Sequence, residues 1–258
     1  MKASWLLLVI IINFSIQLFA QNLIRNPSFE ELSDCPGIGK LTYAIGWDTI
    51  GTVDLFNYCM TYSWFSIGSN NEIITPITAN APFHGDSFCC IGSYLNGNLR
   101  EMAINELVMP LEKKKYCFSF HQAWPRKSPL IMNGYGVYLY KDTFPNRYSP
   151  WLNTPQLAFN SKDHFVTKCN GDWVKLSGIF NAEGGETMLC FGNYSLPNTA
   201  DTLHLNCINN QVNPFPFIGS WDIFDYFELY ELSEIKKAEF DYLPCDGSHV
   251  PIWASGAE

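Results

Sequence analysis

Short strand-like segments recur along the chain, with turn-forming residues between them. Apolar and polar positions alternate, or apolar residues cluster, over residues 41–47, 87–94, 100–109, 116–124, 135–140, 173–180, 187–194 and 218–230. Turn signals such as Asn96-Gly97-Asn98 and Glu183-Gly184-Gly185 separate these segments. Apolar residues nowhere repeat with a helical period over a dozen positions. The pattern therefore predicts an all-β protein, an antiparallel β-sandwich of the jelly-roll type.

The beginning of the chain has the composition of a secretory signal peptide. Lys2 gives a basic start, a short apolar run follows, and the small residue Ala20 stands at a plausible cleavage position. The apolar run is too short to span a bilayer, and no later stretch is long and apolar enough to be a transmembrane segment. We therefore expect residues 1–20 to be removed and the protein to be secreted or held at the cell surface.

The last part of the chain differs in composition from the strand-rich middle. A charged stretch leads into a Tyr-Leu-Pro-Cys-Asp-Gly sequence, and residues 250–258 are similar to the opening strand of an immunoglobulin-like domain. We therefore expect one β-sandwich over residues 21–231. Residues 232–258 are then expected to be a linker and the start of an immunoglobulin-like domain, as in the front part of a longer, multidomain chain.

Charge and aromatic content narrow the expected function. The chain has 16 Lys and Arg against 25 Asp and Glu, and its net charge of −9 argues against a nucleic-acid partner, which needs a basic surface. Aromatic residues make up 16% of the chain. They can supply rings for ligand stacking in addition to the core.

The nine cysteines fit an exported protein, in which disulfides persist. Cys35 and Cys59 lie in turn-rich segments, so we expect a disulfide between them, and Cys169 with Cys207 is the second choice. No Cys or His spacing suggests a zinc site. Buried free thiols are expected within the apolar strand segments, at Cys89, Cys90, Cys117 and Cys190.

Several short motifs follow one another in the first quarter of the chain. They are Asn-Leu-Ile-Arg-Asn-Pro-Ser-Phe-Glu over residues 22–30, Cys35-Pro36, Gly46-Trp47, and Asp54-Leu55-Phe56-Asn57-Tyr58-Cys59. This series resembles the start of the galactose-binding-like jelly rolls, which include carbohydrate-binding modules. In particular, it resembles the variant found in surface proteins of gliding bacteria that use type IX secretion.

The resemblance continues to about residue 231. His84-Gly85-Asp86-Ser87-Phe88 is similar to the family's glycine-led strand start, and Ile223-Phe224-Asp225-Tyr226-Phe227 is similar to its closing strand. The resemblance implies a fold of two packed antiparallel sheets and a function in glycan binding or surface adhesion.

The resemblance also implies a structural calcium ion where the first and last strands meet. Glu30 and Asp225 would supply carboxylate oxygens, and backbone carbonyls near Asp48 and Gly85 would complete a shell of about six to eight oxygens. Tyr226 stands where the family has a second Asp. The alternative is that Glu30 and Asp225 only cap strand ends.

Residues suited to sugar binding alternate with core residues on two strands. In the segment 116–124, alternation places His121 on the face opposite the apolar one. In the segment 135–140, it places Tyr138 and Tyr140 opposite the apolar face. We expect these three residues to share a concave, solvent-facing sheet, with Arg100 joining them from the preceding strand. Aromatic rings stack on the C–H faces of sugars, while polar groups bond their hydroxyls.

Two alternatives to this binding face stay open. The first is that the two tyrosines only cover the sheet beneath a long loop. The second is that the ligand contacts aromatic residues of exposed loops, namely Trp64, Phe65 and Trp151.

A serine esterase is the least favoured interpretation. Gly85-Asp86-Ser87 is similar to the nucleophile block of the Gly-Asp-Ser-Leu esterases, and Asp246 and His249 have the family's Asp-x-x-His spacing. Pro82, however, interrupts the strand that would present Ser87, and the helices of an α/β hydrolase are missing from the pattern. We expect a non-catalytic, calcium-stabilised module that binds a glycan or cell-surface polysaccharide. The alternative is a purely structural surface module.

Overall fold

The computed structural model shows a β-sandwich. It describes residues 21–61, 65–75, 78–94, 100–125, 130–145, 148–149, 152–159, 171–195, 202–204 and 219–232. The predicted signal peptide, residues 233–258, Trp64 and Trp151 lie outside these residues. Within the described part of the chain, no helix has the length and apolar character needed to cross a membrane.

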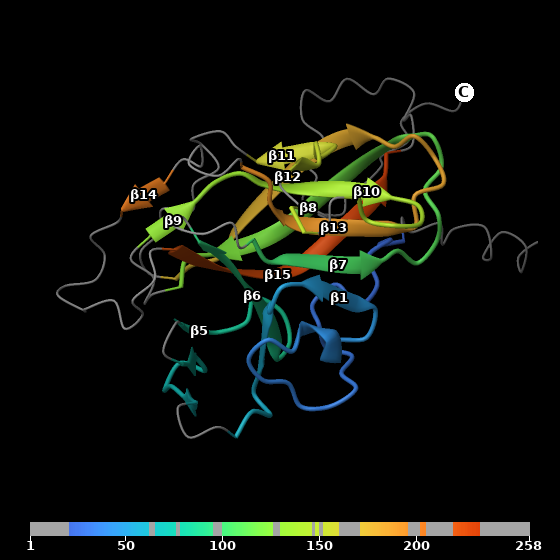
Figure 1. The fold of residues 1–258 in the computed structure, drawn as a ribbon. Helices are drawn as coiled ribbons and strands as arrows, with labels where there is room; N and C mark the ends of the chain where they lie inside the picture. The colour runs from blue at the N-terminus through green and yellow to red at the C-terminus, as the bar shows by residue number, and fades with distance from the viewer. Residues whose placement is uncertain are drawn as a thin grey trace, which may run out of the picture.

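Two antiparallel five-stranded sheets form the two layers of the sandwich (Figure 1). The first sheet has the order β1 (Trp47–Ile50), β7 (Met102–Glu106), β13 (Met188–Asn193), β10 (Tyr135–Tyr140) and β11 (Leu157–Phe159). The second has the order β12 (Val174–Asn181), β8 (Lys115–Ala123), β15 (Gly219–Glu231), β6 (Ser87–Tyr94) and β2 (Asp54–Asn57). The all-β sandwich predicted from the sequence is therefore confirmed.

Small elements accompany the two large sheets. A three-stranded sheet contains β3 (Ser66–Ile67), β4 (Ile73–Ile74) and β5 (Ala79–Asn80), and a two-stranded sheet pairs β9 (Leu130–Met132) with β14 (Thr202–His204). A 3-10 turn, η1 (Leu41–Tyr43), precedes β1. The strand predicted over residues 41–47 is therefore wrong. Gly46 has a φ of +84°, which is not a strand conformation, so β1 begins only at the next residue, Trp47.

Aromatic rings from both sheets fill the space between the layers. Phe191 of the first sheet lies with its ring centroid 4.8 Å from that of Phe120 and 5.0 Å from that of Phe224, both in the second sheet. The side chains of Phe118, Phe120 and Tyr116 face this core, as strand alternation predicted. Each fully buried Phe contributes about 2 to 3 kcal/mol by removing its ring from water.

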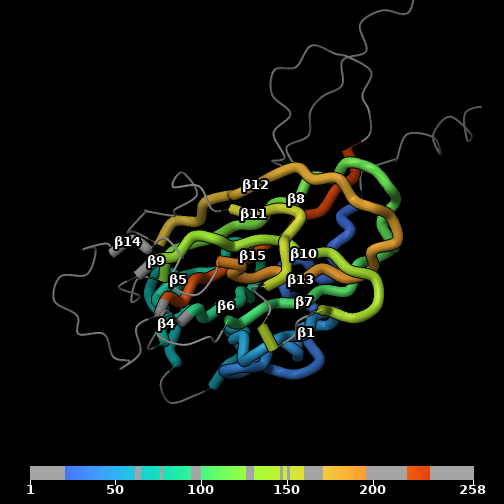
Figure 2. Tube along the Cα trace, turned by 45° about the horizontal axis from the view of Figure 1, so that its top comes forward, coloured from blue at the N-terminus to red at the C-terminus, as the bar shows by residue number. Residues whose placement is uncertain are grey.

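The N-terminal segment lies beside β15, as Figure 2 shows in blue and red. The Leu23 N–H donates to the Leu229 carbonyl at 2.9 Å, and the Phe227 N–H donates to the Pro27 carbonyl at 2.9 Å. The Asn22 side chain donates to the Phe227 carbonyl at 2.9 Å and accepts the Leu229 N–H at 3.0 Å. The first and last parts of the sandwich therefore meet, as the resemblance implied.

The predicted disulfide is confirmed: Cys35 and Cys59 are bonded, with their Cα atoms 5.9 Å apart. Cys89, Cys90 and Cys190 are buried and form no disulfide, also as predicted. Cys117 is disulfide-bonded, so the free thiol predicted there is wrong. Cys117 lies between two core-facing residues of β8, so its own side chain is on the outer side of the strand, away from the core. Cys169 and Cys207 lie outside the described residues.

Candidate functional site

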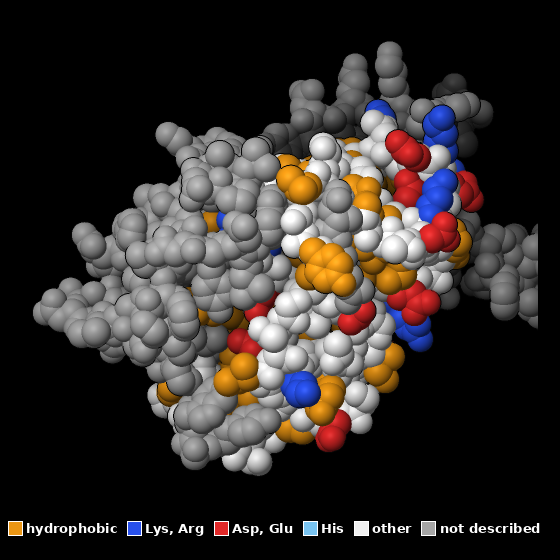
Figure 3. Space-filling view, in the orientation of Figure 1, with side chains coloured by type: hydrophobic (Ala, Val, Ile, Leu, Met, Phe, Trp, Pro, Cys, Tyr) orange, Lys and Arg blue, Asp and Glu red, His pale blue; other side chains and the backbone are white. Residues whose placement is uncertain are grey.

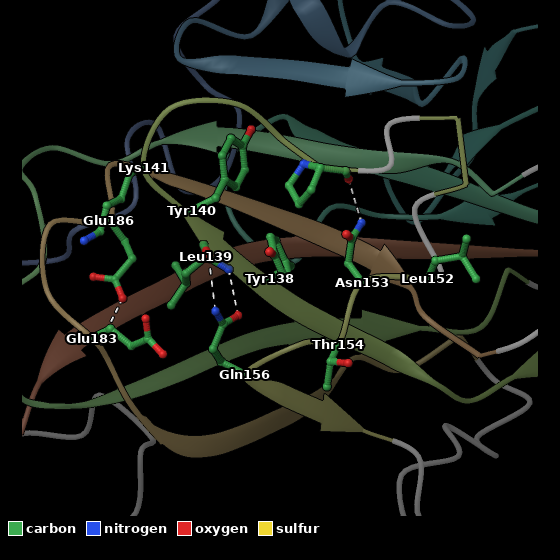
Figure 4. A pocket seen from close by; sticks show the side chains of 11 residues that line it. Tyr138, Leu139, Tyr140, Lys141, Leu152, Asn153, Thr154, Gln156, Glu183 and Glu186 are labelled. Carbon is green, nitrogen blue, oxygen red and sulfur yellow. Dashed lines mark hydrogen bonds between the residues drawn. The ribbon is translucent and has the colours of Figure 1, made fainter.

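The outer face of the first sheet carries both polar and apolar side chains. Figure 3 shows this face. Most of its acidic and basic side chains lie near one edge, and hydrophobic side chains are scattered among uncharged polar ones over the rest. A cavity of about 660 Å³, which we call the β10 pocket, opens here. Its lining includes the end of β10, the segment that follows it, and the turn between β12 and β13 (Figure 4): Tyr138, Leu139, Tyr140, Lys141, Pro145, Leu152, Asn153, Thr154, Gln156, Glu183 and Glu186.

Tyr138 and Tyr140 form the aromatic part of the β10 pocket. Both lie on the side of β10 opposite the core, as alternation predicted, and both are half-buried. Their ring centroids lie 6.3 Å apart with 28° between the planes. Phe144 supports both rings edge-on, at 5.5 Å from Tyr138 and 5.4 Å from Tyr140. The two rings are therefore held in place by apolar packing while part of each stays exposed.

Side-chain hydrogen bonds fix the walls of the β10 pocket. The Gln156 amide accepts the Leu139 N–H at 2.8 Å and donates to the Leu139 carbonyl at 3.2 Å (Figure 4). The Asn153 amide donates to the Pro145 carbonyl at 2.9 Å. These bonds tie the segment after β10 back to the strand and its own turn, so the cavity is preformed rather than assembled by a ligand.

Charged groups of both signs stand at the pocket. Lys141 and Glu183 are exposed, whereas the Glu186 carboxylate is buried and accepts the N–H groups of Glu183 at 2.7 Å and Gly184 at 2.9 Å. Glu186 thus shapes the turn, while Lys141 and Glu183 are available to a ligand. Donors, acceptors and two rings in one cavity suit a polyhydroxylated ligand.

The other predicted ligand residues lie elsewhere. His121 belongs to β8 of the second sheet, and Arg100 is 2% exposed beside Ser93. The predicted face shared by Arg100, His121, Tyr138 and Tyr140 is therefore wrong, because β8 and β10 belong to different sheets. Trp64 and Trp151 lie outside the described residues, and the half-buried Phe65 packs against a small apolar cluster around Phe88.

Sequence reasoning missed most of the pocket wall. The sequence predicts no strand between residues 140 and 173, although β11 and the wall residues Asn153 and Gln156 lie there. These two residues bond backbone groups, and no periodic pattern marks such a role. The only signal was the pair of outward-facing tyrosines on β10.

The predicted calcium ligands Glu30 and Asp225 hold one loop between them. Asp225 is fully buried, and its carboxylate accepts the N–H groups of Phe83 and His84 at 2.9 Å each and of Tyr226 at 2.6 Å. Burial raises the pKa of Asp225, and the negative charge of Glu30 acts in the same direction.

Glu30 holds the other side of that loop by hydrogen bonds. It accepts the N–H groups of Asp86 and Ser87 at 3.0 Å each. Gly85 has a φ of +64°, and a Cβ there would lie 2.3 Å from the Glu30 carboxyl carbon. Only glycine fits between these groups.

Backbone N–H groups already bond the two carboxylates that are predicted to bind calcium. The oxygens of Glu30 and Asp225 accept five such groups, and the carboxylate of the exposed Asp48 accepts the N–H of Thr49 at 2.8 Å. Among the described residues, no three His, Cys, Asp or Glu side chains converge in a way that could hold a metal ion. Calcium binding at Glu30, Asp225, Asp48 and Gly85 stays a prediction.

The esterase interpretation gains no support at Ser87. The side chain is fully buried at the start of β6, and its hydroxyl accepts a hydrogen bond from the Asn57 amide at 2.8 Å. A nucleophile needs access to its substrate and a base within hydrogen-bond reach. Asp246 and His249 lie outside the described residues.

Comparison with known proteins finds similarity among solved structures alone. The sequence matches no family model and no curated protein. The CBM22-1 xylan-binding domain of Xyn10C from Paenibacillus barcinonensis aligns with a TM-score of 0.41 and 12% identity, over 83% of this chain and 97% of that domain.

Two further structures are similar over most of their length. The K3 cleaved adhesin domain of Lys-gingipain from Porphyromonas gingivalis has a TM-score of 0.37 and 14% identity, over 80% of this chain and 96% of that one. A putative sugar binding protein from Bacteroides thetaiotaomicron has a TM-score of 0.26 and 10% identity, over 82% of this chain and 100% of that one. We assign no function from similarities at this level.

Proposed function

We propose that the protein is an exported, non-catalytic module that binds a glycan in the β10 pocket. The observation that carries the proposal is the pair of half-exposed rings, Tyr138 and Tyr140, side by side in a preformed polar cavity. Sugar rings stack their C–H faces on such aromatic rings, and neighbouring donors and acceptors bond the hydroxyl groups. The cavity volume lies within the usual range of small-ligand sites.

Export and surface adhesion belong to the same proposal. The Cys35–Cys59 bond fits an oxidising compartment, because disulfides rarely persist in the cytosol. Binding is expected to be weak, with a Kd of about 10⁻⁵ to 10⁻³ M, because two rings and a few exposed hydrogen bonds offset only part of the cost of ordering a flexible sugar. Affinity of this size suits a module that acts in many copies on a cell surface.

A glycan array followed by calorimetric titration of the best hit tests the proposal. Tyr138→Ala should weaken binding by about 1 to 2 kcal/mol and leave the fold intact, because the ring lies outside the core. Tyr43→Ala is the matched control, since Tyr43 is a half-buried tyrosine in η1, outside the pocket lining. An array without any hit would favour a purely structural module. Unchanged affinity in Tyr138→Ala would place the site elsewhere.

A further inference from the structure

The outer face of the second sheet carries an aromatic cluster that the β10 pocket does not use. We call it the Phe83 platform, and it consists of Phe83, His84, His121, Trp173 and Tyr226. Phe83 is 44% exposed, and its ring lies nearly parallel to the His121 imidazole, with 3.6 Å between centroids and 13° between planes. Tyr226 borders the stack, 5.9 Å from Phe83 and 5.0 Å from His84.

The backbone beneath the platform is held rigidly. Asp225 accepts the N–H groups of Phe83 and His84, and the Ser28 hydroxyl lies 3.0 Å from the Nδ1 atom of His84. The Trp173 indole donates to the Ala81 carbonyl at 3.0 Å. An exposed ring on a fixed backbone loses little conformational entropy when a ligand stacks on it, which favours binding.

Tyr226 reaches the platform through an unfavourable backbone conformation. Its φ is +50°, and it lies at an irregularity in the pairing of β15 with β8, between Asp225 and Glu228. A non-glycine residue in the left-handed region costs about 1 kcal/mol or more, and bulges of this kind re-aim side chains. Such strain persists where the surrounding structure or a function maintains it. Here it places Tyr226 beside Phe83.

The groups that face the platform leave it without excess charge. Lys175 on β12 forms an ion pair of 2.7 Å with Glu228 on β15, and the Ser119 hydroxyl donates to the same carboxylate oxygen at 2.7 Å. The lysine disfavours a cationic ligand on the stack, and because its charge is paired with Glu228, the stack offers no net charge to an anion.

We propose that the Phe83 platform is a second glycan-binding site, which stacks the apolar face of a neutral pyranose ring on Phe83 and Tyr226. The platform lies on the outer face of the second sheet, whereas the β10 pocket lies on the first. It is independent of that pocket, because the two sites share no residue. With one site on each sheet, a single domain binds two glycan segments, so it cross-links chains or gains avidity on one polysaccharide.

Nuclear magnetic resonance titration of the full secreted chain tests this proposal. The probes are the methyl glycosides of glucose, galactose, mannose and xylose, added singly to tens of millimolar, and choline chloride is the cation control. In the Tyr138→Ala variant, which weakens binding in the β10 pocket, at least one glycoside should still shift the ring signals of Phe83 and Tyr226. In Phe83→Ala, the Kd at the platform should rise about tenfold or more, while the pocket Kd stays within twofold.

Ile179→Ala is the matched control, because Ile179 is 50% exposed and lies on β12 of the same sheet, outside the platform. It should leave both sites unchanged. The proposal is overturned if no glycoside shifts the Phe83 and Tyr226 signals, or if choline alone shifts them. It is also overturned if the Tyr226 signals of the Phe83→Ala variant respond to the glycoside as they do in the wild type. If a glycoside shifts the platform signals of the wild-type protein but not the signals of Tyr138 and Tyr140, glycan binding in the β10 pocket is refuted and glycan binding at the platform is supported.

Discussion

On the first sheet, the rings of Tyr138 and Tyr140 lie against apolar side chains of the sheet and of Phe144. On the second sheet, Phe83 stands on a loop that the carboxylates of Asp225 and Glu30 hold through backbone N–H groups. The rings of the pocket are thus supported by dispersion and apolar burial, and the platform by buried hydrogen bonds. The two sites should therefore fail under different substitutions.

The largest effect is expected from Asp225→Ala, which removes the support of the platform. Three N–H groups would lose their acceptor, and each buried unsatisfied donor costs about 1 to 3 kcal/mol. We expect about 4 kcal/mol less unfolding free energy in urea, and loss of ring stacking at Phe83. The pocket should still bind glycan under conditions where the variant is folded. Asp225→Asn keeps one acceptor oxygen and should lose less stability.

The same variant tests the calcium prediction. A bound ion would stabilise the wild-type fold by mass action, so chelator would lower its melting temperature, and Asp225→Ala would abolish that difference. Identical wild-type melting curves with and without chelator would refute calcium binding. The N–H contacts would then be the whole role of Asp225.

Phe144→Ala is the corresponding test of the pocket. Phe144 is 6% exposed and contacts both pocket tyrosines, so its removal should cost about 3 kcal/mol of stability and loosen both rings. We expect weaker glycan binding in the pocket and an unchanged platform, measured by urea unfolding and titration. Leu152→Ala is the control, because Leu152 lines the pocket but is 59% exposed. If Phe144→Ala weakens glycan binding equally at both sites, the two sites are not supported independently of each other.

The difference between local and long-range information explains what the sequence predicted. Alternation is local, so it correctly placed Tyr138 and Tyr140 outside the core and Phe118 and Phe120 inside it. The sheet to which a strand belongs depends on distant partners. His121 was assigned to the wrong sheet because β8 pairs with β12 and β15.

The contacts around Asp225 show a second limit of the sequence. The motifs correctly indicated that Glu30, Gly85 and Asp225 come together. Carboxylates bind cations and N–H donors alike, however, and only the structure identifies the donors as backbone amides of residues 83, 84, 86, 87 and 226. The Phe83 platform could not be predicted, because Phe83 lies outside every strand and reaches His121 only through this loop.

A change on β2, at a residue of neither binding site, should alter stability without affecting either site. Asp54 on β2 is 8% exposed, and burial raises its pKa to about 7, with the charge of Glu101 adding to the increase. A folded-state pKa above the unfolded value stabilises the fold below about pH 4, and this contribution is lost as the pH rises through 7. Asp54→Asn should therefore be about 2 kcal/mol more stable than wild type at pH 8 and no more stable at pH 4. Urea unfolding at both values decides, and a constant difference would contradict the raised pKa.

Lys175→Met should give the smallest effect, and it tests the uncharged character of the platform. Lys175 pairs with Glu228, which keeps the Ser119 hydroxyl at 2.7 Å as a second partner, so we expect a loss of about 1 kcal/mol. The lysine also helps to lower the pKa of His121, after the larger effect of burial. The variant should therefore raise this pKa above about 4, which a histidine titration by nuclear magnetic resonance can follow.

The sign of the accompanying stability change follows from that shift. A depressed histidine pKa destabilises the fold as the pH falls below about 6.5, so Lys175→Met should lose less stability between pH 6.5 and 4 than wild type. Ser177→Ala, on the same strand and exposed, should change neither quantity. An unaltered His121 titration in Lys175→Met would mean that burial alone keeps the imidazole neutral. The Phe83 stack would then be uncharged near neutral pH whether or not the ion pair beside it is formed.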